Sequence, residues 1–542
     1  MKKRHKSLLM LIMLLALLVG CTKSTDEIVP NTTSTTEVTE DSVGETSTPS
    51  TSTTTISNQK EMIIAMNTPT TLHPLYNVPE NVRQALFLIF SPLINIEENG
   101  TISSNIAKSW MVNETETAVT ITLRDDVKFH DGQSLTTEDV IFTLQQIQQI
   151  PTSPYKGTVE NIASMEAIDT HTLKIVYKQA FSGILQTLFF PVMPKHIYSV
   201  TDQSTVAMKP VGSGPYVFQG FTTSKKMSLT ANNNYFKGKP FIENVKVNII
   251  PDEESSLYAF KQGLIDVVYT DLTEWGKYAN SKGTTSYEMI SNIYEFLGLN
   301  LNKGIFQSAN IREALLCAIN RQDLVQRYYL EHAVVTDTPI SPASYLYDKR
   351  IEIRGYDKEK ARFLLTQEGY EKDSNGYMSK NNVPLSFSIL VNKENTDRVK
   401  IANALKEAYG ELGISITVDA VDKETYFSRI TNRQYDAFLG GLRLSYATDL
   451  SFALNSAYCS NGENYVGYAD SHMDELLAKA FTATEATKAD AFNALQQYFI
   501  IQNPYLSLYF KKSVMMTSNQ ITGNIKPTPL NIYANVEEWT KS

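Results

Sequence analysis

LRDDVKFHDGQSLTTEDVIFTL, residues 123–144, is the most informative stretch of the 542-residue chain. Three apolar residues, Leu123, Val127 and Phe129, lie among charged ones and predict a half-buried strand. The Asp-Gly pair at 131–132 then predicts a tight turn, since glycine adopts positive φ without a steric penalty. The first half of the stretch therefore predicts a strand that ends in a turn.

The second half of the same stretch predicts the start of a helix. Thr136 is followed three residues later by Asp139, which is the spacing of a capping box. Apolar residues then recur at helical spacing, at Val140, Ile141, Leu144 and Ile147. A strand, a turn and a capped helix in this order predict a structural corner.

This corner resembles the signature of a known family. IAKSW at 106–110, HDG at 130–132 and EDV at 138–140 are similar to the pattern of the family 5 extracytoplasmic solute-binding proteins, the oligopeptide, dipeptide and nickel receptors of ABC importers. Further matching segments are PVGSGPY at 210–216, FKQGLIDV at 260–267, REAL at 312–315 and AINR at 318–321. The resemblance covers essentially the whole chain after residue 59.

The resemblance implies an α/β protein with a two-lobed periplasmic-binding-protein-like fold, of the large cluster C type with an extra inserted subdomain. The lobes would close over a ligand, and the closed form would be recognised by a transporter. The implied boundaries are lobe I at 59–90, 207–297 and 513–542, the inserted subdomain at 91–206, and lobe III at 298–512. Chain crossings between lobes I and III would form the hinge.

The alternation of helix and strand patterns agrees with an α/β body. Helices are predicted at 81–90, 310–329, 357–369, 395–413 and 488–502. Strands are predicted at 61–67, 120–123, 172–176, 385–390, 414–418, 437–442 and 506–516.

His130 beside Asp131 has the residue types of a catalytic or metal-binding pair, but no third ligand follows at usable spacing. We interpret the pair as structural. The cysteines are Cys21, Cys317 and Cys459, with no CxxC pair and no Cys/His cluster. We therefore expect no metal and no cofactor, and free thiols at the last two cysteines, the first of them buried.

The N-terminus has the pattern of an export signal. Residues 2–6 are mostly cationic, and the apolar run at 8–19 is too short to cross a membrane. The run leads into LVGC at 18–21, which resembles a bacterial lipobox. We predict a lipoprotein signal peptide over 1–20 and acylation of Cys21, which would anchor the chain because two or more acyl chains bind a membrane stably.

Residues 22–58 contain 20 Ser or Thr among 37 positions and no aromatic residue. Such a segment cannot bury enough apolar surface to fold, so we predict a disordered tether over 21–58. The tether would hold the body at the outer face of the cell membrane in a single-membrane bacterium, or on the periplasmic side in a double-membrane one. The formal charge of −9 predicts no binding of nucleic acid.

The resemblance also implies which residues line the ligand cleft. They are Tyr76, Asn77, Val78, Tyr269, Thr270, Asp271, Gly441, Arg443, Ser445, Tyr446 and Asp449. In peptide receptors of the family, an aspartate stands directly before the last tyrosine of this set and neutralises the α-amino group of the peptide. This chain has Ser445 at that position.

Three explanations of Ser445 stay open. Asp449 or Asp271 could take over the amine, the ligand could lack a free N-terminus at that point, or the ligand could be something other than a peptide. The question matters because a charge-assisted hydrogen bond is worth roughly 1.5–3 kcal/mol. Arg443 in the same segment could face a ligand carboxylate or pair with an internal acid.

The leading hypothesis is a monomeric, lipid-anchored receptor that captures oligopeptides and delivers them to the permease subunits of an ABC importer and their ATPases. The same fold would also suit a metal chelate, an oligosaccharide or a signalling peptide. No GxSxG, HExxH, Walker, EF-hand or CxxC motif occurs, so we do not expect an enzyme. A cryptic hydrolase and a surface adhesion or sensory lipoprotein are the alternatives from other classes.

Overall fold

The computed structural model describes residues 61–542 except 77, 201–207, 224 and 279–280. The predicted signal peptide, Cys21 and the tether lie outside the described residues, and so does Asn77. All the described helices and strands belong to one compact unit.

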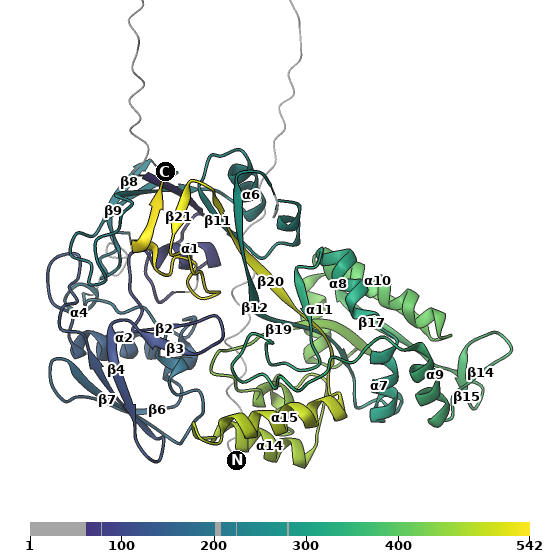
Figure 1. Ribbon diagram of the computed structural model, residues 1–542. Coiled ribbons are helices and arrows are strands. Elements are labelled where there is room, and N and C mark those ends of the chain that lie inside the picture. Colours follow the sequence, from purple (N-terminus) through teal and green to yellow (C-terminus); the bar gives the residue numbers. More distant parts are fainter. Residues whose placement is uncertain (1–60, 77, 201–207, 224, 279–280) are drawn as a thin grey trace, which may run out of the picture. The chain divides into compact units, whose positions relative to one another are not determined.

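A large mixed sheet of 11 strands runs through the body (Figure 1). Its order is β18 (Ser415–Val421), β17 (Ser386–Asn392), β19 (Ala437–Arg443), β12 (Thr284–Leu299), β20 (Leu506–Ser518), β11 (Val267–Thr270), β1 (Glu61–Met66), β10 (Asn244–Ile249), β9 (Lys226–Ala231) and β8 (Tyr216–Thr223), with β13 (Ala333–Val335) paired to β20. The two longest strands, β12 and β20, therefore lie between the other members of the sheet.

β12 and β20 each contribute to two hydrophobic cores. One core is built from side chains within residues 294–510, and the other from side chains within 62–289 and 515–539. β12 supplies Tyr294 to the former and Met289 to the latter. We call the part around the 62–289 core the first lobe and the part around the 294–510 core the second lobe. The fold is thus α/β and two-lobed, as predicted, and the lobes share two continuous strands.

The pairing between these two strands is interrupted where the cores change over. β12 and β20 pair in antiparallel fashion, but the register shifts between Ile290 and Tyr294. Residues 291–293 of β12 consequently have no partner in β20, although Ile293 pairs with Arg443 of β19. A register shift of this kind bends a strand and turns its side chains in a new direction.

A second, four-stranded antiparallel sheet belongs to the first lobe. Its order is β4 (Ala107–Val112), β5 (Ala118–Leu123), β7 (Thr172–Tyr177) and β6 (Ile162–Ala167). This sheet lies within the predicted inserted subdomain, yet its buried side chains belong to the same core as those of β1 and β10. The predicted subdomain boundaries stay a prediction.

β5 (Ala118–Leu123) ends at Leu123. The prediction that the strand continues to Phe129 is therefore wrong. After the strand the chain turns, and Arg124 Nε donates to Asp126 Oδ1 at 2.8 Å. Val127 and Phe129 are nonetheless buried. Their apolar character reflects a loop that packs on the core.

The predicted turn and helix cap are both confirmed. Gly132 has a φ of +91° and donates its N–H to the Phe129 carbonyl at 2.9 Å. The Thr136 N–H donates to Asp139 Oδ2 at 2.9 Å, which completes the capping box at the start of α2 (Thr137–Gln149). The sequence spacing therefore identified a real corner.

His130 joins this corner to the glycine-rich segment at 210–216. Its backbone N–H donates to the Gly212 carbonyl at 2.8 Å, and its Nε2 lies 3.1 Å from the Gly214 carbonyl oxygen. A Cβ on Gly212 would lie 2.1 Å from the Ile89 carbonyl oxygen, so only glycine fits there. His130 thus has a structural role, and burial lowers its pKa to about 4.

Protonation of His130 and His73 gives a pH-dependent stability. Burial lowers both pKa values to about 4, whereas unfolded histidine titrates near 6.5. Between these pH values the unfolded state binds more protons, so the free energy of unfolding falls as pH drops from about 6.5 to 4. We expect on the order of 2 kcal/mol from each histidine. Thermal unfolding of the protein and of His130→Gln at pH 7.5 and 4.5 tests this, and an equal loss of stability in both would contradict it.

The structure has two helices, α7 (Ala309–Cys317) and α8 (Arg321–Tyr329), where the sequence predicts one continuous helix. Asn320 caps the second helix by accepting a hydrogen bond from a backbone N–H of its first turn. The Arg321 guanidinium is 3% exposed and lies 2.7 Å from the fully buried Asp337 carboxylate. The first residue of α8 is thus held by a buried ion pair.

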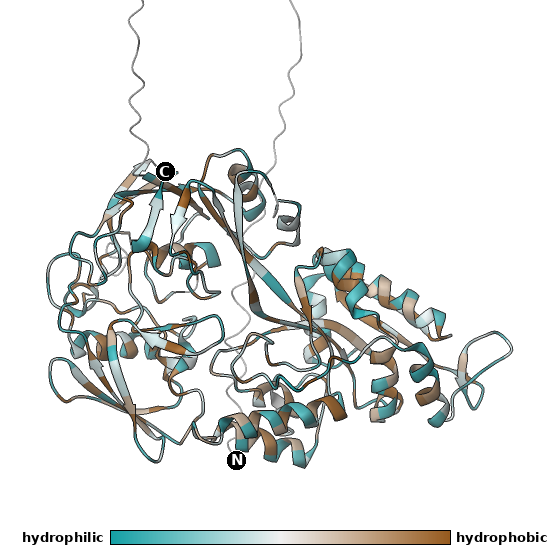
Figure 2. Ribbon diagram, in the orientation of Figure 1, coloured by the Kyte–Doolittle hydropathy of each residue, from teal (hydrophilic) through white to brown (hydrophobic). Residues whose placement is uncertain are grey.

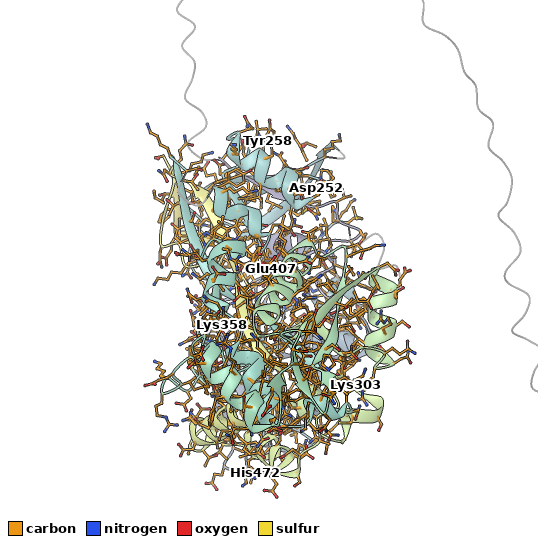
Figure 3. All side chains as sticks on the ribbon, turned by 90° about the vertical axis from the view of Figure 1, so that its right-hand side faces the viewer. Asp252, Tyr258, Lys303, Lys358, Glu407 and His472 are labelled. Atoms are coloured by element: carbon orange, nitrogen blue, oxygen red, sulfur yellow. The ribbon has the colours of Figure 1, made fainter. Side chains whose placement is uncertain are left out.

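The other predicted helices are confirmed within a few residues. They are α1 (Glu80–Leu86), α9 (Lys358–Gln367), α10 (Thr396–Glu411) and α15 (Lys488–Gln502). Figure 2 shows hydrophilic and hydrophobic residues together on α14 (Ser471–Phe481) and α15, as expected of helices that cover a core. Figure 3 labels Asp252 and Tyr258 at the outer edge of α6 (Glu253–Lys261), where Asp252 caps the helix and Tyr258 is exposed.

The remaining elements are short. They are β2 (Ile94–Ile96), β3 (Ile102–Ser104), α3 (Lys156–Val159), α4 (Lys195–Tyr198), β14 (Glu371–Lys372), β15 (Met378–Lys380), β16 (Val383–Pro384), α11 (Lys423–Thr431), α12 (Ser451–Leu454), α13 (Tyr458–Asn461), β21 (Ile521–Gly523), β22 (Trp539–Lys541) and the 3₁₀ turns at Gln186–Leu188, Thr273–Lys277, Gly304–Phe306 and Val536–Glu538. Cys317 and Cys459 are free thiols, and burial raises the pKa of Cys317 to about 11.

Candidate functional site

A cavity of about 440 Å³ lies where the lobes meet, next to the interrupted pairing of β12 and β20. Its walls come from α1, from residues 154–161 and 181–189, from 269–271, and from 443–449, which begin at the last residue of β19. Residues 291–293 of β12 also line it. The register shift therefore places irregular strand backbone at the cavity wall.

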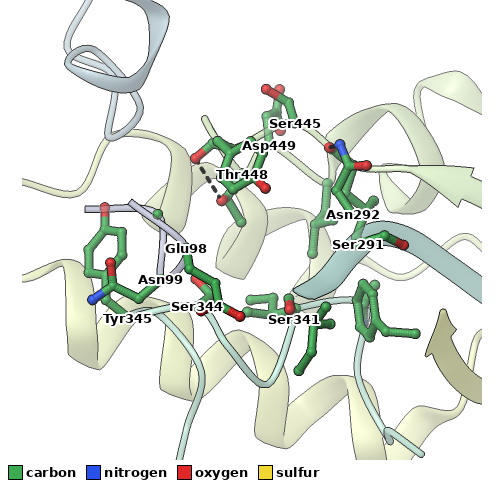
Figure 4. A pocket seen from close by; sticks show the side chains of 18 residues that line it. Glu98, Asn99, Ser291, Asn292, Ser341, Ser344, Tyr345, Ser445, Thr448 and Asp449 are labelled. Carbon is green, nitrogen blue, oxygen red and sulfur yellow. Dashed lines mark hydrogen bonds between the residues drawn. The ribbon is translucent and has the colours of Figure 1, made fainter. Parts of the chain in front are cut away.

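A smaller cavity of about 50 Å³ adjoins the larger one. The two share Ser291, Asn292, Leu444, Ser445, Tyr446 and Asp449. Figure 4 shows the side chains around the smaller cavity, with Glu98 and Asn99 from the β2–β3 turn and Thr448 and Asp449 from the segment after β19. The two cavities form one candidate ligand site.

Six of the residues implied by the resemblance line the larger cavity, namely Tyr269, Asp271, Arg443, Ser445, Tyr446 and Asp449. Tyr76 and Val78 do not line either cavity. The Tyr76 ring is exposed and packs edge-on against His73 at 4.8 Å, and Val78 is buried in the core of the first lobe. A ligand contact by Tyr76, Asn77 or Val78 stays a prediction.

Thr270 and Gly441 have structural contacts behind the cavity wall. Thr270 is fully buried and donates its hydroxyl to Glu253 Oε2 at 3.0 Å. A Cβ on Gly441 would lie 2.4 Å from Arg398 Nη2 and 2.7 Å from Glu295 Oε1. Gly441 therefore makes room for the Arg398–Glu295 ion pair, whose nearest atoms are 2.8 Å apart.

Gly441→Ala should destabilise the fold rather than act on the ligand directly. The added methyl collides with a buried ion pair, and such overpacking costs about 1–3 kcal/mol. Gly410→Ala is the matched control, because a Cβ there meets nothing within 4 Å and alanine favours the helix. Thermal unfolding checks both variants. A Gly441→Ala protein of unchanged stability that has lost ligand binding would contradict this role.

Three residues of the cavity wall were not predicted from the sequence, namely Glu80 and Arg83 of α1 and Tyr155. Glu80 and Arg83 line the cavity and form an ion pair one helical turn apart. Burial lowers the pKa of Arg83, and the neighbouring Glu80 carboxylate raises it. The net effect is an increase in this pKa, so the guanidinium stays charged. Burial also raises the pKa of Tyr155 and of Tyr269, which keeps both phenols protonated as hydrogen-bond donors. The i, i+3 spacing of Glu80 and Arg83 was the available sequence signal.

Other charged groups of the wall have no ionic partner among the described residues. Asp271, Asp449, Glu160 and Arg443 line the larger cavity and occur in none of the ion pairs of the described chain. Arg443 Nη1 approaches only Asn292 Oδ1, at 3.4 Å. Asp449 accepts a hydrogen bond from the Ser451 N–H at 2.9 Å. The cavity thus offers free carboxylates and one free guanidinium to a ligand.

The lobes also contact each other beside the cavity. The Phe181 and Phe481 rings stack with centroids 5.2 Å apart, and the Ser182 N–H donates to the Phe481 carbonyl at 2.7 Å. Gly183 lies so close to the site segment that a Cβ on it would be 2.5 Å from the Ala447 carbonyl oxygen. These contacts close one side of the site independently of β12 and β20.

Within the described residues, no group of three or more His, Cys, Asp or Glu side chains is placed to hold a metal ion. No helix in this part of the chain is long and apolar enough to span a membrane.

Two α/β lobes that share long strands and bound a ligand-sized cavity define a class of solute-binding proteins. The chain belongs to one family of that class: the model of the bacterial extracellular solute-binding proteins, family 5 Middle, matches residues 101–464. The family resemblance predicted from the sequence is therefore confirmed.

Relatives and solved structures are similar to this chain over most of its length. The oligopeptide-binding protein AppA of Bacillus subtilis is 27% identical over 87% of this chain and 89% of its own. The heme-binding protein A of Haemophilus influenzae is 22% identical over 81% of this chain and 84% of its own. Among structures, AppA of Bacillus subtilis in complex with a nonapeptide matches at 24% identity with a TM-score of 0.65, over 89% of this chain and 99% of that one. CtaP of Listeria monocytogenes matches at 22% identity with a TM-score of 0.76, over 89% and 99%. These structures share the fold.

Proposed function

We propose that this protein is the substrate-binding component of an ABC importer and captures oligopeptides. The observation that carries the proposal is the cavity between the lobes, whose wall holds carboxylates and a guanidinium that have no ionic partner among the described residues. Its volume of about 440 Å³ is in the range of small-molecule sites. A relative over most of the chain is an oligopeptide-binding protein. The protein would release its ligand unchanged to a permease, and no enzymatic step is proposed.

A peptide has groups that match this wall. Its ammonium would pair with Asp449 or Asp271, and its carboxylate with Arg443. The irregular backbone at 291–293 would exchange hydrogen bonds with the peptide main chain, which every peptide presents. Reading the main chain and leaving side chains in hydrated space allows broad specificity. In this arrangement Asp449 or Asp271 takes the role of the family's aspartate, whose position is occupied by Ser445 in this chain.

Alanine substitution of the two acids tests the amine anchor. Asp449→Ala or Asp271→Ala should lower peptide affinity roughly 10- to 100-fold, because a charge-assisted bond is lost. Asp125→Ala, at an exposed acid outside both cavities, is the control. Isothermal titration calorimetry with a peptide that co-purifies, identified by native mass spectrometry, measures this.

Several results would contradict parts of the proposal. Unchanged affinity in both variants would refute the amine anchor. A co-purifying metal chelate, heme or oligosaccharide in place of peptides would favour a non-peptide ligand. Cleaved peptides after incubation with the protein would indicate a hydrolase.

The proposal includes the membrane anchor and the assembly state. Residues 1–20 would be removed, Cys21 would carry the lipid, and 21–58 would tether a monomeric body to the outer face of the cell membrane. The lobe and subdomain boundaries predicted from the sequence belong to the same proposal.

The proposed lipid anchor can be tested by labelling the protein in cells. Wild-type protein should incorporate labelled fatty acid and sediment with membranes, because two or more acyl chains bind a bilayer stably. Cys21→Ala should lose the label. Label retained by the variant would mean that lipid is attached elsewhere.

A further inference from the structure

A turn of the second lobe reaches across to the first lobe. Residues 445–448 follow β19, yet Tyr446 and Ala447 are partly buried against the first-lobe core. Phe481, the last residue of α14, packs against the same core, whereas the fully buried side chains of α14 belong to the second-lobe core. We call residues 445–448 together with Phe481 the latch. The latch residues thus contact the core of the opposite lobe.

Gly183 of the first lobe lets the latch approach closely. Its neighbours Phe181 and Ile184 are buried in the first-lobe core. A Cβ on Gly183 would lie 2.5 Å from the Ala447 carbonyl oxygen and 2.6 Å from the Ala447 Cβ, which is too close for non-bonded atoms. The φ of Gly183 is not positive, so the close approach excludes a side chain and the backbone conformation does not. A methyl group here would push the latch away from the first lobe.

Hydrogen bonds cross between the lobes at the walls of both cavities. Beside the larger cavity, the Ser182 N–H donates to the Phe481 carbonyl at 2.7 Å. Beside the smaller one, the Tyr345 N–H donates to the carbonyl of Asn99 at 2.9 Å, and Gln186 Nε2 donates to the Tyr345 hydroxyl at 3.1 Å. Tyr345 packs on the second-lobe core, and Asn99 lies in the turn between β2 and β3 of the first lobe. The lobes are therefore in contact at two places around the site.

The latch ends in a strained residue. Thr448 has a φ of +48°, in the left-handed region, where a β-branched side chain crowds the backbone. Its N–H donates to the Ser445 carbonyl at 3.0 Å, and the Ala447 N–H donates to Ser445 Oγ at 3.1 Å. Asp449, the next residue, lines both cavities. Strain of this kind persists where surrounding contacts hold the residue, so the docked latch and the position of Asp449 are linked through Thr448.

We propose that the latch holds the two lobes together and, through Thr448, positions Asp449 for the ligand. Docking of the latch needs the space at Gly183, which lines neither cavity. A ligand that binds Asp449 stabilises the docked latch, and the docked latch raises the affinity for the ligand, because the two equilibria are linked. The inference rests on the proposed function and adds to it that Gly183 and Thr448 are positioning residues that set the affinity.

Gly183→Ala should prevent the latch from docking. We expect the affinity for the peptide that co-purifies to fall about tenfold or more, because the binding-competent form becomes less populated. The midpoint of thermal unfolding should stay within a degree or two, on the order of experimental scatter, because neither lobe core is altered. Gly355→Ala is the matched control, since this glycine also lacks a positive φ and a Cβ there meets nothing within 4 Å. Isothermal titration calorimetry on the full-length protein measures the affinities.

Hydrogen–deuterium exchange detects the docked latch independently of affinity. The Ser182 N–H is protected by a carbonyl of the other lobe, so fragments covering 181–189 should exchange more slowly when the peptide is added. Wild type and Gly355→Ala should both show this slowing. Gly183→Ala should exchange faster than wild type in this segment, with and without the peptide.

Thr448→Gly should have the opposite effect on affinity. Glycine adopts the left-handed conformation without crowding, so the docked latch becomes more stable. We expect peptide binding about threefold tighter than in wild type and slower exchange of 181–189 in the absence of peptide. Damage to the fold cannot produce tighter binding. Unchanged or weaker binding would contradict the linkage through Thr448.

The outcomes separate the latch from the proposed function. If Gly183→Ala binds the peptide as tightly as wild type, or if 181–189 exchanges equally in both, the latch is wrong while peptide binding stands. If wild type binds no peptide and carries a non-peptide solute, the proposed function fails. Exchange of the ligand-free proteins then still tests the latch: faster exchange of 181–189 in Gly183→Ala supports it, and equal exchange overturns it.

Discussion

The pairing of β12 with β20 joins the two lobes. Both strands pass from one hydrophobic core into the other, and they pair with each other on either side of the change from one core to the other. Of the two register shifts in this ladder, the one between Ile290 and Tyr294 lies at the cavity, which residues 291–293 line. The strands that join the lobes therefore also supply to the site a strand segment that has no partner in β20.

Charges are distributed differently behind the site and on its wall. Behind it, Arg321 pairs with Asp337 and Arg398 with Glu295, and each pair is largely removed from solvent. Breaking such a pair would leave an uncompensated buried charge, so these residues are committed to the fold. On the wall, Asp271, Asp449 and Arg443 lack ionic partners in the described chain. A solute in the cavity can therefore pair with these three side chains.

Local patterns predicted local structure well. The Asp-Gly turn, the Thr136 capping box and the helix that begins after Asp357 depend on contacts a few residues apart. Long-range contacts were not predictable. Arg321 at the start of α8 pairs with Asp337 outside the helix, and Val127 is buried in a loop whose apolar residues resemble a strand. The family resemblance found the site segment around Arg443, but Glu98 and Gln186 reach the cavities only through tertiary packing.

We infer that the two lobes joined by β12 and β20 move closer together when a solute enters between them. Small-angle X-ray scattering of the protein, with and without a peptide that calorimetry shows to bind, measures this directly. We expect a smaller radius of gyration in the presence of the peptide. An identical scattering curve at saturating peptide would contradict it, because the ligand would then occupy a rigid body.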